Sequence, residues 1–324
     1  MPSSFVGKLA GTLCASFLAA GALAQSFPSK PVNIIVPYTA GGSSDAFTRA
    51  LGQRLSETWG QPVLVENRAG AATMIGTQYV AKSAADGYTL LFVTDSFAIN
   101  KILYAKVLYD PLRDFAAISL LCNLNQLIAI NGSLPATSLK EFVELAKAKP
   151  GAMNYGSYGA GSPPHLDMEL FKHITGISLV HVPYKGVAPM SADLVAGVIQ
   201  VGVLAIGTTV PLHKSGRIKA LAIDGTKRSP LLPDVPTFAE VGYPEMQAPA
   251  WWGIVAPAAT PKDTIDFLHR DIVRVVNEPQ FRERRMVNAG LDPAGSTPAE
   301  FTEVIRDTMT RWEPIIKSAN IKPE

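Results

Sequence analysis

Short apolar runs alternate with amphipathic segments along this chain, and this alternation limits the possible folds more than any other feature. The run Val32–Val36 is nearly continuous in β-branched residues, as expected of a strand that is buried on both faces. The predicted order is strand Val32–Val36, helix Ser44–Trp59, strand Val63–Val65, helix Ala72–Ala81 and strand Thr89–Val93. This order predicts an α/β protein with mostly parallel sheets.

The same plan returns in the middle of the chain, after a predicted helix over Ser138–Lys149. Residues Met153–Phe171 read MNYGSYGAGSPPHLDMELF: the end of a strand, a glycine-rich loop, and a helix that begins near Pro164. Residues Ile34–Arg49, IIVPYTAGGSSDAFTR, are arranged in the same way at the first strand. The two stretches differ letter by letter, but each places a flexible turn between a strand and the start of a helix.

Turns of this kind favour anions. The unpaired amide groups and the dipole at a helix start attract negative charge, and glycine lets the backbone approach a ligand closely. Two such loops predict a cleft with an anion site on each wall. The alternative is that both are ordinary strand-to-helix turns.

The motifs of several enzyme classes are absent from these loops. Neither AGGSSD nor GSYGAGSP matches the nucleotide motif G-x-G-x-x-G, and no G-K-[ST] follows. Ser157 does not match the G-x-S-x-G pattern of serine hydrolases. His165, His173 and His181 lie eight residues apart without neighbouring cysteines, which is not a metal-ligand spacing. We therefore predict no catalytic residues, no metal and no cofactor.

The first residues have the layout of a secretory signal peptide. Lys8 precedes an apolar run, and Ala22-Leu23-Ala24 is an A-x-A cleavage site, which predicts a signal peptide over residues 1–24. The apolar run is too short for the roughly 20 residues of a membrane-spanning helix. We therefore predict export to the periplasm.

Charge and cysteine content exclude several classes of partner. The chain has 29 basic and 27 acidic residues, a balance that does not indicate binding to nucleic acid or to a membrane surface. After cleavage Cys122 would be the one remaining cysteine, so no internal disulfide is expected. The remaining length fits two domains better than one.

Several stretches in order carry a resemblance that covers the whole predicted mature chain. They are KPVNIIVPYTAGGSSDAFTR, QPVLVENRAGA, DGYTLLF, YDPLRDFAAIS, HVPYKG, RSPLLPDVPTFAEVG and APAATPKDTIDFL. This set resembles the Bug/TctC family, the extracytoplasmic solute-binding proteins of tripartite tricarboxylate transporters. The resemblance implies a two-lobed, type II-like periplasmic binding protein, with two Rossmann-like lobes that close over a small carboxylate. It also implies a monomer whose partners are that ligand and the membrane permease subunits of a transporter.

The resemblance assigns the first anion site to the turn after the first strand. Its residues would be Tyr38, Ala40, Gly41, Gly42, Ser43 and Ser44. Backbone amides would bind one carboxylate there. Asp45 would repel an anion and is better interpreted as a helix cap.

The second site would lie between Ser157 and His165. Its members would be Ser157, Gly159, Gly161, Ser162 and His165, joined by Lys185 and Asp193. Ser162 would donate to a carboxylate. His165 would either contact the ligand or pack within the protein, and Lys185 and Asp193 would either reach the ligand or remain solvated.

The third strand and a later segment complete the expected pocket. Asp95 and Ser96 follow the third strand, and Asp95 and Phe97 depart from the small hydroxyl residues common in the family. Thr208 lies in Ile199–Thr209, an apolar segment where relatives commonly carry acidic residues. This absence of acids weakens the case for a cationic or amino-acid ligand. With Tyr38, Phe97, Trp251 and Trp252 as candidate contacts, it favours an aromatic or otherwise bulky apolar carboxylate, and a dicarboxylate is the other ligand class that we expect. The alternative for each ring is a place in the core.

The resemblance also implies how the chain divides. Lobe 1 would comprise residues 25–122 and 255–324, and lobe 2 residues 123–254. A C-terminal stripe of Phe301, Val304, Ile305, Met309 and Trp312 should dock on lobe 1.

Three classes of function remain open. We favour a transport receptor without chemistry. The alternatives are a secreted enzyme that acts on a carboxylate, and a sensor that passes its ligand-bound state to a membrane kinase.

Overall fold

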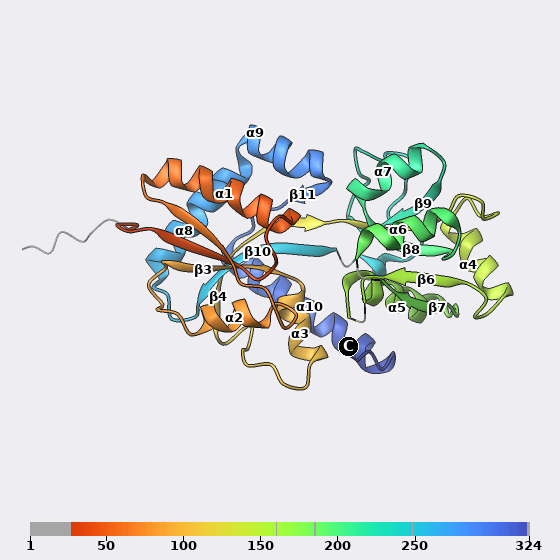
Figure 1. Cartoon of the computed structure of the whole chain (residues 1–324), viewed down its shortest axis with the longest axis horizontal. Helices are drawn as coiled ribbons and strands as arrows, with labels where there is room; N and C mark the ends of the chain where they lie inside the picture. The colour runs from red at the N-terminus through yellow and green to blue at the C-terminus, as the bar shows by residue number, and fades with distance from the viewer. Residues whose placement is uncertain (1–26, 160, 185, 248, 323–324) are drawn as a thin grey trace, which may run out of the picture.

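The two-lobed arrangement is visible in the computed structural model, which describes residues 27–322 except 160, 185 and 248 (Figure 1). A six-stranded sheet lies in one lobe and a five-stranded sheet in the other. The predicted signal peptide lies outside the described residues. Within them, we find no helix with the length and apolar character needed to cross a membrane.

The strands keep the predicted α/β order. The first sheet, in the order β11-β4-β10-β3-β1-β2, is formed by β1 (Val32–Val36), β2 (Val63–Asn67), β3 (Thr89–Thr94), β4 (Phe115–Leu124), β10 (Ala250–Pro257) and β11 (Leu291–Pro293). The second, in the order β7-β6-β8-β5-β9, is formed by β5 (Gln126–Asn131), β6 (Asn154–Ser157), β7 (Val180–Pro183), β8 (Val201–Ala205) and β9 (Ile218–Ile223).

The fold class is confirmed, but the sheets are mixed rather than mostly parallel. β1 pairs in parallel with β2 and β3, and β6 does so with β7 and β8. β10 is antiparallel to β3, and β5 is antiparallel to β8. The reason is topological: β5 and β10 are the strands that arrive from the other lobe. Each therefore runs against the strands that end at the cleft.

The sheet changes refine the expected lobe boundaries. β4 ends at Leu124 in the first sheet and β5 begins at Gln126 in the second, two residues beyond the expected boundary after Cys122. The whole of β10 pairs within the first sheet, whereas the expected return at 254/255 falls inside this strand. We therefore propose that lobe 1 resumes at Ala250.

Helices cover both faces of each sheet. Those that follow strands of the first sheet are α1 (Ser43–Trp59), α2 (Met74–Ala81), α3 (Ser96–Leu103), α8 (Lys262–Asn277), α9 (Pro279–Phe281) and α10 (Pro298–Ser318), with the π-helix η2 (Arg282–Met286) and the 3-10 helix η3 (Val287–Ala289). Those of the second lobe are α4 (Leu139–Ala148), α5 (Pro163–Thr175), α6 (Val187–Ala196), α7 (Ile206–Lys214) and the 3-10 helix η1 (Pro244–Met246).

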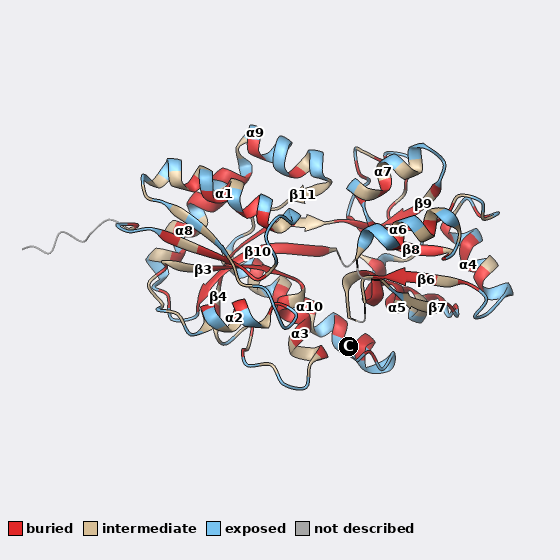
Figure 2. Ribbon diagram, viewed as in Figure 1, coloured by how far each residue is buried: buried red, intermediate tan, exposed pale blue. Residues whose placement is uncertain are grey.

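Helix α1 shows how the sequence sets these elements. Phe47, Leu51 and Leu55 recur every four residues and are buried against the first sheet, while the opposite side of the helix is exposed (Figure 2). The helix ends at Gly60, which adopts the left-handed conformation with φ of 65°. Burial of this stripe fixes the helix start at the carboxyl end of β1.

The C-terminal helix α10 joins the two lobes. Phe301 and Ile305 are buried in the cluster that covers the first sheet, and Val304 and Met309 pack against it, as expected. Trp312 instead belongs to the cluster that joins Ile99 and Leu103 of α3 to the core of the second lobe, so it packs where the two lobes meet rather than on lobe 1 alone. The helix has 21 residues and is long enough to continue past the first sheet.

Gly253 in β10 is required by the packing of α10. A Cβ atom at this position would overlap the ring of Phe301, which is fully buried. We expect Gly253→Ala to lower the free energy of unfolding by about 1–3 kcal/mol, the usual cost of overpacking a core. Gly202→Ala in β8 is the matched control, because its new methyl group would lie 3.7 Å from Leu194, an ordinary contact. Equal urea midpoints for the two variants would contradict this account.

Candidate ligand-binding site

The turn between β1 and α1 leaves the start of α1 open. Gly42 is the N-cap of α1 in an extended conformation, and no side chain caps the helix. Residues 40–43 are exposed. A helix start has amide groups without an intrahelical partner, so the first turn at Ser43 and Ser44 presents donors to solvent.

Asp45 does not cap α1 as we expected but folds back onto the turn. Its carboxylate accepts hydrogen bonds from the Gly41 amide at 2.9 Å and from Asn67 Nδ2 at 3.0 Å. Arg49 Nε lies 3.0 Å from the same carboxylate. The Gly41 hydrogen bond above all, with those from Arg49 and Asn67, keeps the pKa of Asp45 below its usual value. The Gly41 amide is therefore used within the turn, and the predicted donors that remain are those of Ala40, Gly42, Ser43 and Ser44.

A chain of hydroxyl groups ties this turn to the end of β3. Tyr38 Oη lies 2.7 Å from Thr94 Oγ1, and Thr94 donates to Ser96 Oγ at 3.1 Å. Burial raises the pKa of Tyr38 to about 12, so the phenol stays protonated at neutral pH. The structure thus brings Tyr38 and Ser96, two of the predicted site residues, into one chain of hydrogen bonds.

Asp95 faces a different part of the molecule. It is buried and precedes α3, where its carboxylate accepts from the Ser96 amide at 3.0 Å. It lines a hollow of about 180 Å³ with Trp251 and Arg311, on the α10 side of the sheet. Burial raises its pKa to about 6. Its structural role is to anchor the start of α3.

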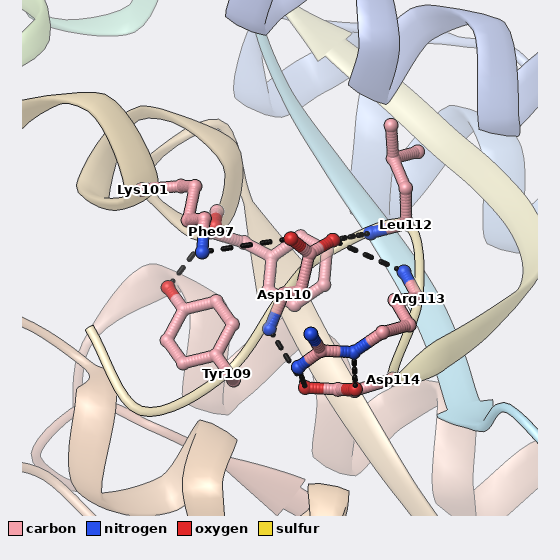
Figure 3. Close-up of polar contacts among 7 residues, drawn as sticks. All are labelled: Phe97, Lys101, Tyr109, Asp110, Leu112, Arg113 and Asp114. Carbon is pink, nitrogen blue, oxygen red and sulfur yellow. Dashed lines mark hydrogen bonds and ion pairs between the residues drawn. The ribbon is translucent and has the colours of Figure 1, made fainter.

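The loop after α3 holds that helix in place (Figure 3). Tyr109 donates its hydroxyl to Phe97 O at 3.0 Å, and Lys101 lies 3.5 Å from the Asp110 carboxylate. Asp110 also accepts from the backbone amides of Leu112 and Arg113, both at 3.1 Å. The polar contacts of the segment YDPLRDF therefore hold α3 in place.

Phe97 is part of the core and does not shape a pocket. It is 2% exposed and its ring packs against Tyr109 and Phe115. Trp251 packs edge-on against Phe301. Both rings are therefore part of the core, which was the alternative interpretation. They give no reason to expect an aromatic ligand.

The second loop offers fewer donors than we expected. Helix α5 begins with Pro163 and Pro164, which have no amide hydrogen. Gly161 donates its amide to His165 Nδ1 at 2.9 Å, and Ser162 donates its hydroxyl to Gly159 O at 2.7 Å. The donors of this loop are thus largely paired within it.

His165 helps to hold the second loop in place. Its ring is buried and stacks on His181 with centroids 4.1 Å apart. Burial and the neighbouring His181 lower its pKa to about 4, so it is neutral at pH 7. A neutral ring that already accepts from Gly161 holds the loop and does not supply positive charge for an anion.

Ser157 and His181 form a pair that resembles a nucleophile and its base. Ser157 Oγ lies 2.6 Å from His181 Nε2. The serine is fully buried, however, and its hydroxyl also contacts the Gly159 amide at 3.1 Å. A nucleophile must reach its substrate, so this geometry fits a structural pair.

Asp193 and Lys185 are the remaining residues predicted for the second site. Asp193 accepts a hydrogen bond from Tyr184 Oη at 2.8 Å, which engages its carboxylate within the second lobe. Lys185 lies outside the described residues. Within the part of the chain that is described, no three His, Cys, Asp or Glu side chains are grouped to hold a metal ion.

Ser43 and Thr208 line the same cavity between the lobes. The cavity has a volume of about 410 Å³ and is lined by the first turn of α1 on one side and the first turn of α7 on the other. Trp252 contributes to its lining, although the ring also packs against Phe47 and Phe92. A cavity of this size fits a small molecule.

Two α/β lobes, joined by crossing strands and enclosing a cavity with an open helix start, define a two-lobed solute-binding protein. The sequence profile described as "Tripartite tricarboxylate transporter family receptor" matches residues 47–321. This chain belongs to that family, TctC, whose members are binding proteins of transporters rather than enzymes. The predicted family is confirmed.

Relatives of known name and structure agree with this assignment. Protein BugT of Bordetella pertussis is 36% identical over 307 residues, 94% of each chain. The structure "R. palustris Rpa4515 with adipate" is similar with a TM-score of 0.77 and 33% identity, covering 92% of this chain and all of the other. MatC from Rhodopseudomonas palustris with bound malate has a TM-score of 0.73 and 28% identity, covering 90% of this chain and all of the other.

Because Asp95 is buried, we expect the free energy of unfolding to depend on pH. Its pKa of about 6 in the folded protein exceeds the usual 3.8, so the folded state holds this proton more tightly than the unfolded state. The stabilisation is complete below pH 3.8 and is lost as the pH rises through 6. We expect the stability of the native protein relative to Asp95→Asn to fall by up to about 3 kcal/mol from pH 4 to pH 7.

Urea unfolding at a series of pH values measures this difference. Asp167 and Asp224 are also buried with raised pKa values, so the comparison with the variant is needed to isolate Asp95. Asp234→Asn, at an exposed position, is the control and should follow the native curve. Parallel curves for the native protein and Asp95→Asn would contradict the assignment.

Proposed function

We propose that this protein is a periplasmic receptor that binds a small carboxylate between its two lobes. It then delivers the carboxylate unchanged to the membrane permease of a tripartite tricarboxylate transporter. The proposal is supported above all by the open start of α1, where no side chain caps the helix, Gly42 and Ser43 are exposed and Ser44 is half-buried. Adipate and malate, the ligands of two similar structures, are both dicarboxylates.

The turn between β1 and α1 can bind an anion although Asp45 lies close to it. Asp45 is paired with Arg49 and is directed at Gly41, so its negative charge is compensated. The cavity beside Ser43 is lined by residues of both lobes. A ligand there would favour the closed arrangement, because it gains contacts from both walls at once.

The second loop has a mainly structural role in this proposal, because none of its described residues lines the cavity. Its packing against the first lobe is close, since a Cβ atom on Gly161 would overlap Leu103 of α3. We propose that Ser157, Gly159, Ser162 and His165 hold this loop in shape through hydrogen bonds within it. The carboxylate itself binds at the α1 turn.

Substitution at Gly42 tests the carboxylate site. The φ of Gly42 is −77°, which any residue adopts, and its nearest neighbour to an added Cβ is Thr39 O at 3.9 Å. Gly42→Val should therefore fold normally while its side chain covers the amides of the first turn. We expect affinity for adipate to fall at least about tenfold, a change of about 1.4 kcal/mol in binding free energy. Gly42→Ala should give an intermediate loss.

Isothermal titration calorimetry measures the effect, with thermal melting as a check on folding. Gly41 is a less suitable position, because its φ of 88° would strain any other residue. Lys140→Val, at an exposed position in the first turn of α4 that does not line the cavity, is the matched control and should change the affinity little. A folded Gly42→Val variant that binds adipate as well as the native protein does would refute this location of the site.

A further inference from the structure

The cavity between the lobes is lined by positive side chains that the sequence did not indicate. Its lining consists of Ser43, Ala46, Phe47, Leu124, Ala205, Gly207, Thr208, Trp252, Arg284, Arg285, Ala289 and Leu291. Two arginines are present in this set and no carboxylate is. The opposite wall is formed by Ala205, Gly207 and Thr208, from a segment, Ile199–Thr209, that also has no acidic residue. The fixed charge of the lining is therefore positive.

Both arginines are available to a ligand. Arg284 and Arg285 are exposed, and among the described residues neither takes part in an ion pair or a side-chain hydrogen bond. They also line a neighbouring surface hollow that contains Glu278. The Glu278 carboxylate accepts hydrogen bonds from Arg54 at 2.8 and 2.9 Å, so it is already paired.

The segment that carries the arginines is fixed to the cavity. They belong to the π-helix η2, a conformation that is rare and often found at functional sites. Met286, at its end, is fully buried. A Cβ atom on Gly290 would lie only 3.2 Å from the Gly207 amide nitrogen at the start of α7. This close approach holds the arginine-bearing segment of the first lobe against the second lobe.

We propose that Arg284 and Arg285 bind the distal anionic group of the ligand and thereby select elongated dianions over monoanions. The inference rests on the proposed function, in which the first carboxylate occupies the start of α1. Arginine suits this role because its planar guanidinium donates two parallel hydrogen bonds to one carboxylate. The wall formed by Ala205–Thr208 closes the cavity without adding negative charge.

Calorimetric titration of matched diacids and monoacids tests the proposal. The probes are succinate, adipate and suberate, each compared with the monoacid of the same chain length: butyrate, hexanoate and octanoate. The variants are Arg284→Gln, Arg285→Gln and the double substitution. Arg282→Gln is the matched control, because Arg282 is exposed on the same π-helix but does not line this cavity.

The native protein should bind at least one diacid about tenfold or more tightly than its monoacid partner. The double variant should lose most of this preference through weaker diacid binding, with monoacid affinity nearly unchanged. Arg282→Gln should behave as the native protein does. Thermal melting without ligand should be the same for all variants, since the substituted side chains are exposed.

Two different failures can be told apart. If the double variant keeps the native diacid preference, the arginines do not bind the ligand and the inference is overturned while the proposed function stands. If the native protein binds none of the six acids, both the carboxylate receptor and the inference fail. An equal loss of diacid and monoacid affinity in the double variant also overturns the inference, because it would show a role without selectivity.

Discussion

The hydrogen bond from the Gly41 amide to the Asp45 carboxylate is the contact on which the candidate site depends. At 2.9 Å it closes the turn between β1 and α1 and turns the aspartate away from the first helical amides. Asn67, at the end of β2, donates to the same carboxylate and to Tyr38 O. Two adjacent strands and a helix therefore fix one turn. Compensation of the Asp45 charge by Arg49 then allows an anion to approach.

The crossing strands give that turn an opposing wall. β4 continues into β5, and β10 returns to the first sheet with all eight of its residues buried. The ends of α3 and α10 pack into the core that also holds the second lobe together, through Leu103, Trp312 and Ile316. The lobes are thus joined by strands on one side and by helix packing on another. The cavity between α1 and α7 is lined by Leu124 of β4 and Trp252 of β10, next to the crossing strands.

Local sequence patterns predicted the elements but not their long-range pairing. Val32–Val36 was correct to the residue, and α1 begins one residue earlier than expected, because buried runs and helical stripes are written in the local sequence. The antiparallel insertion of β5 and β10 depends on how the lobes connect, which no local pattern encodes. Trp312 continues the apolar periodicity of α10 but packs in the cluster that includes the core of the second lobe. This contact also depends on how the lobes connect.

The site was predictable in part. The β1–α1 turn could be recognised from its glycines, and Ser43 and Thr208 line one cavity. The second loop was assigned too many donors, although Pro163 and Pro164 in the sequence already excluded two amides. Its stacked histidines depend on β6, β7 and α5 lying together, which only the fold brings about. The Arg284–Arg285 pair follows no motif and became visible only from its place beside α7.

The most direct test of the central claim is a crystal structure of the protein with a bound dicarboxylate such as adipate. The account predicts one carboxylate within hydrogen-bonding distance, about 2.7–3.2 Å, of the backbone amides in the first turn of α1. The ligand should lie between this turn and the second lobe. A carboxylate bound elsewhere, with the first turn of α1 free of ligand, would contradict it.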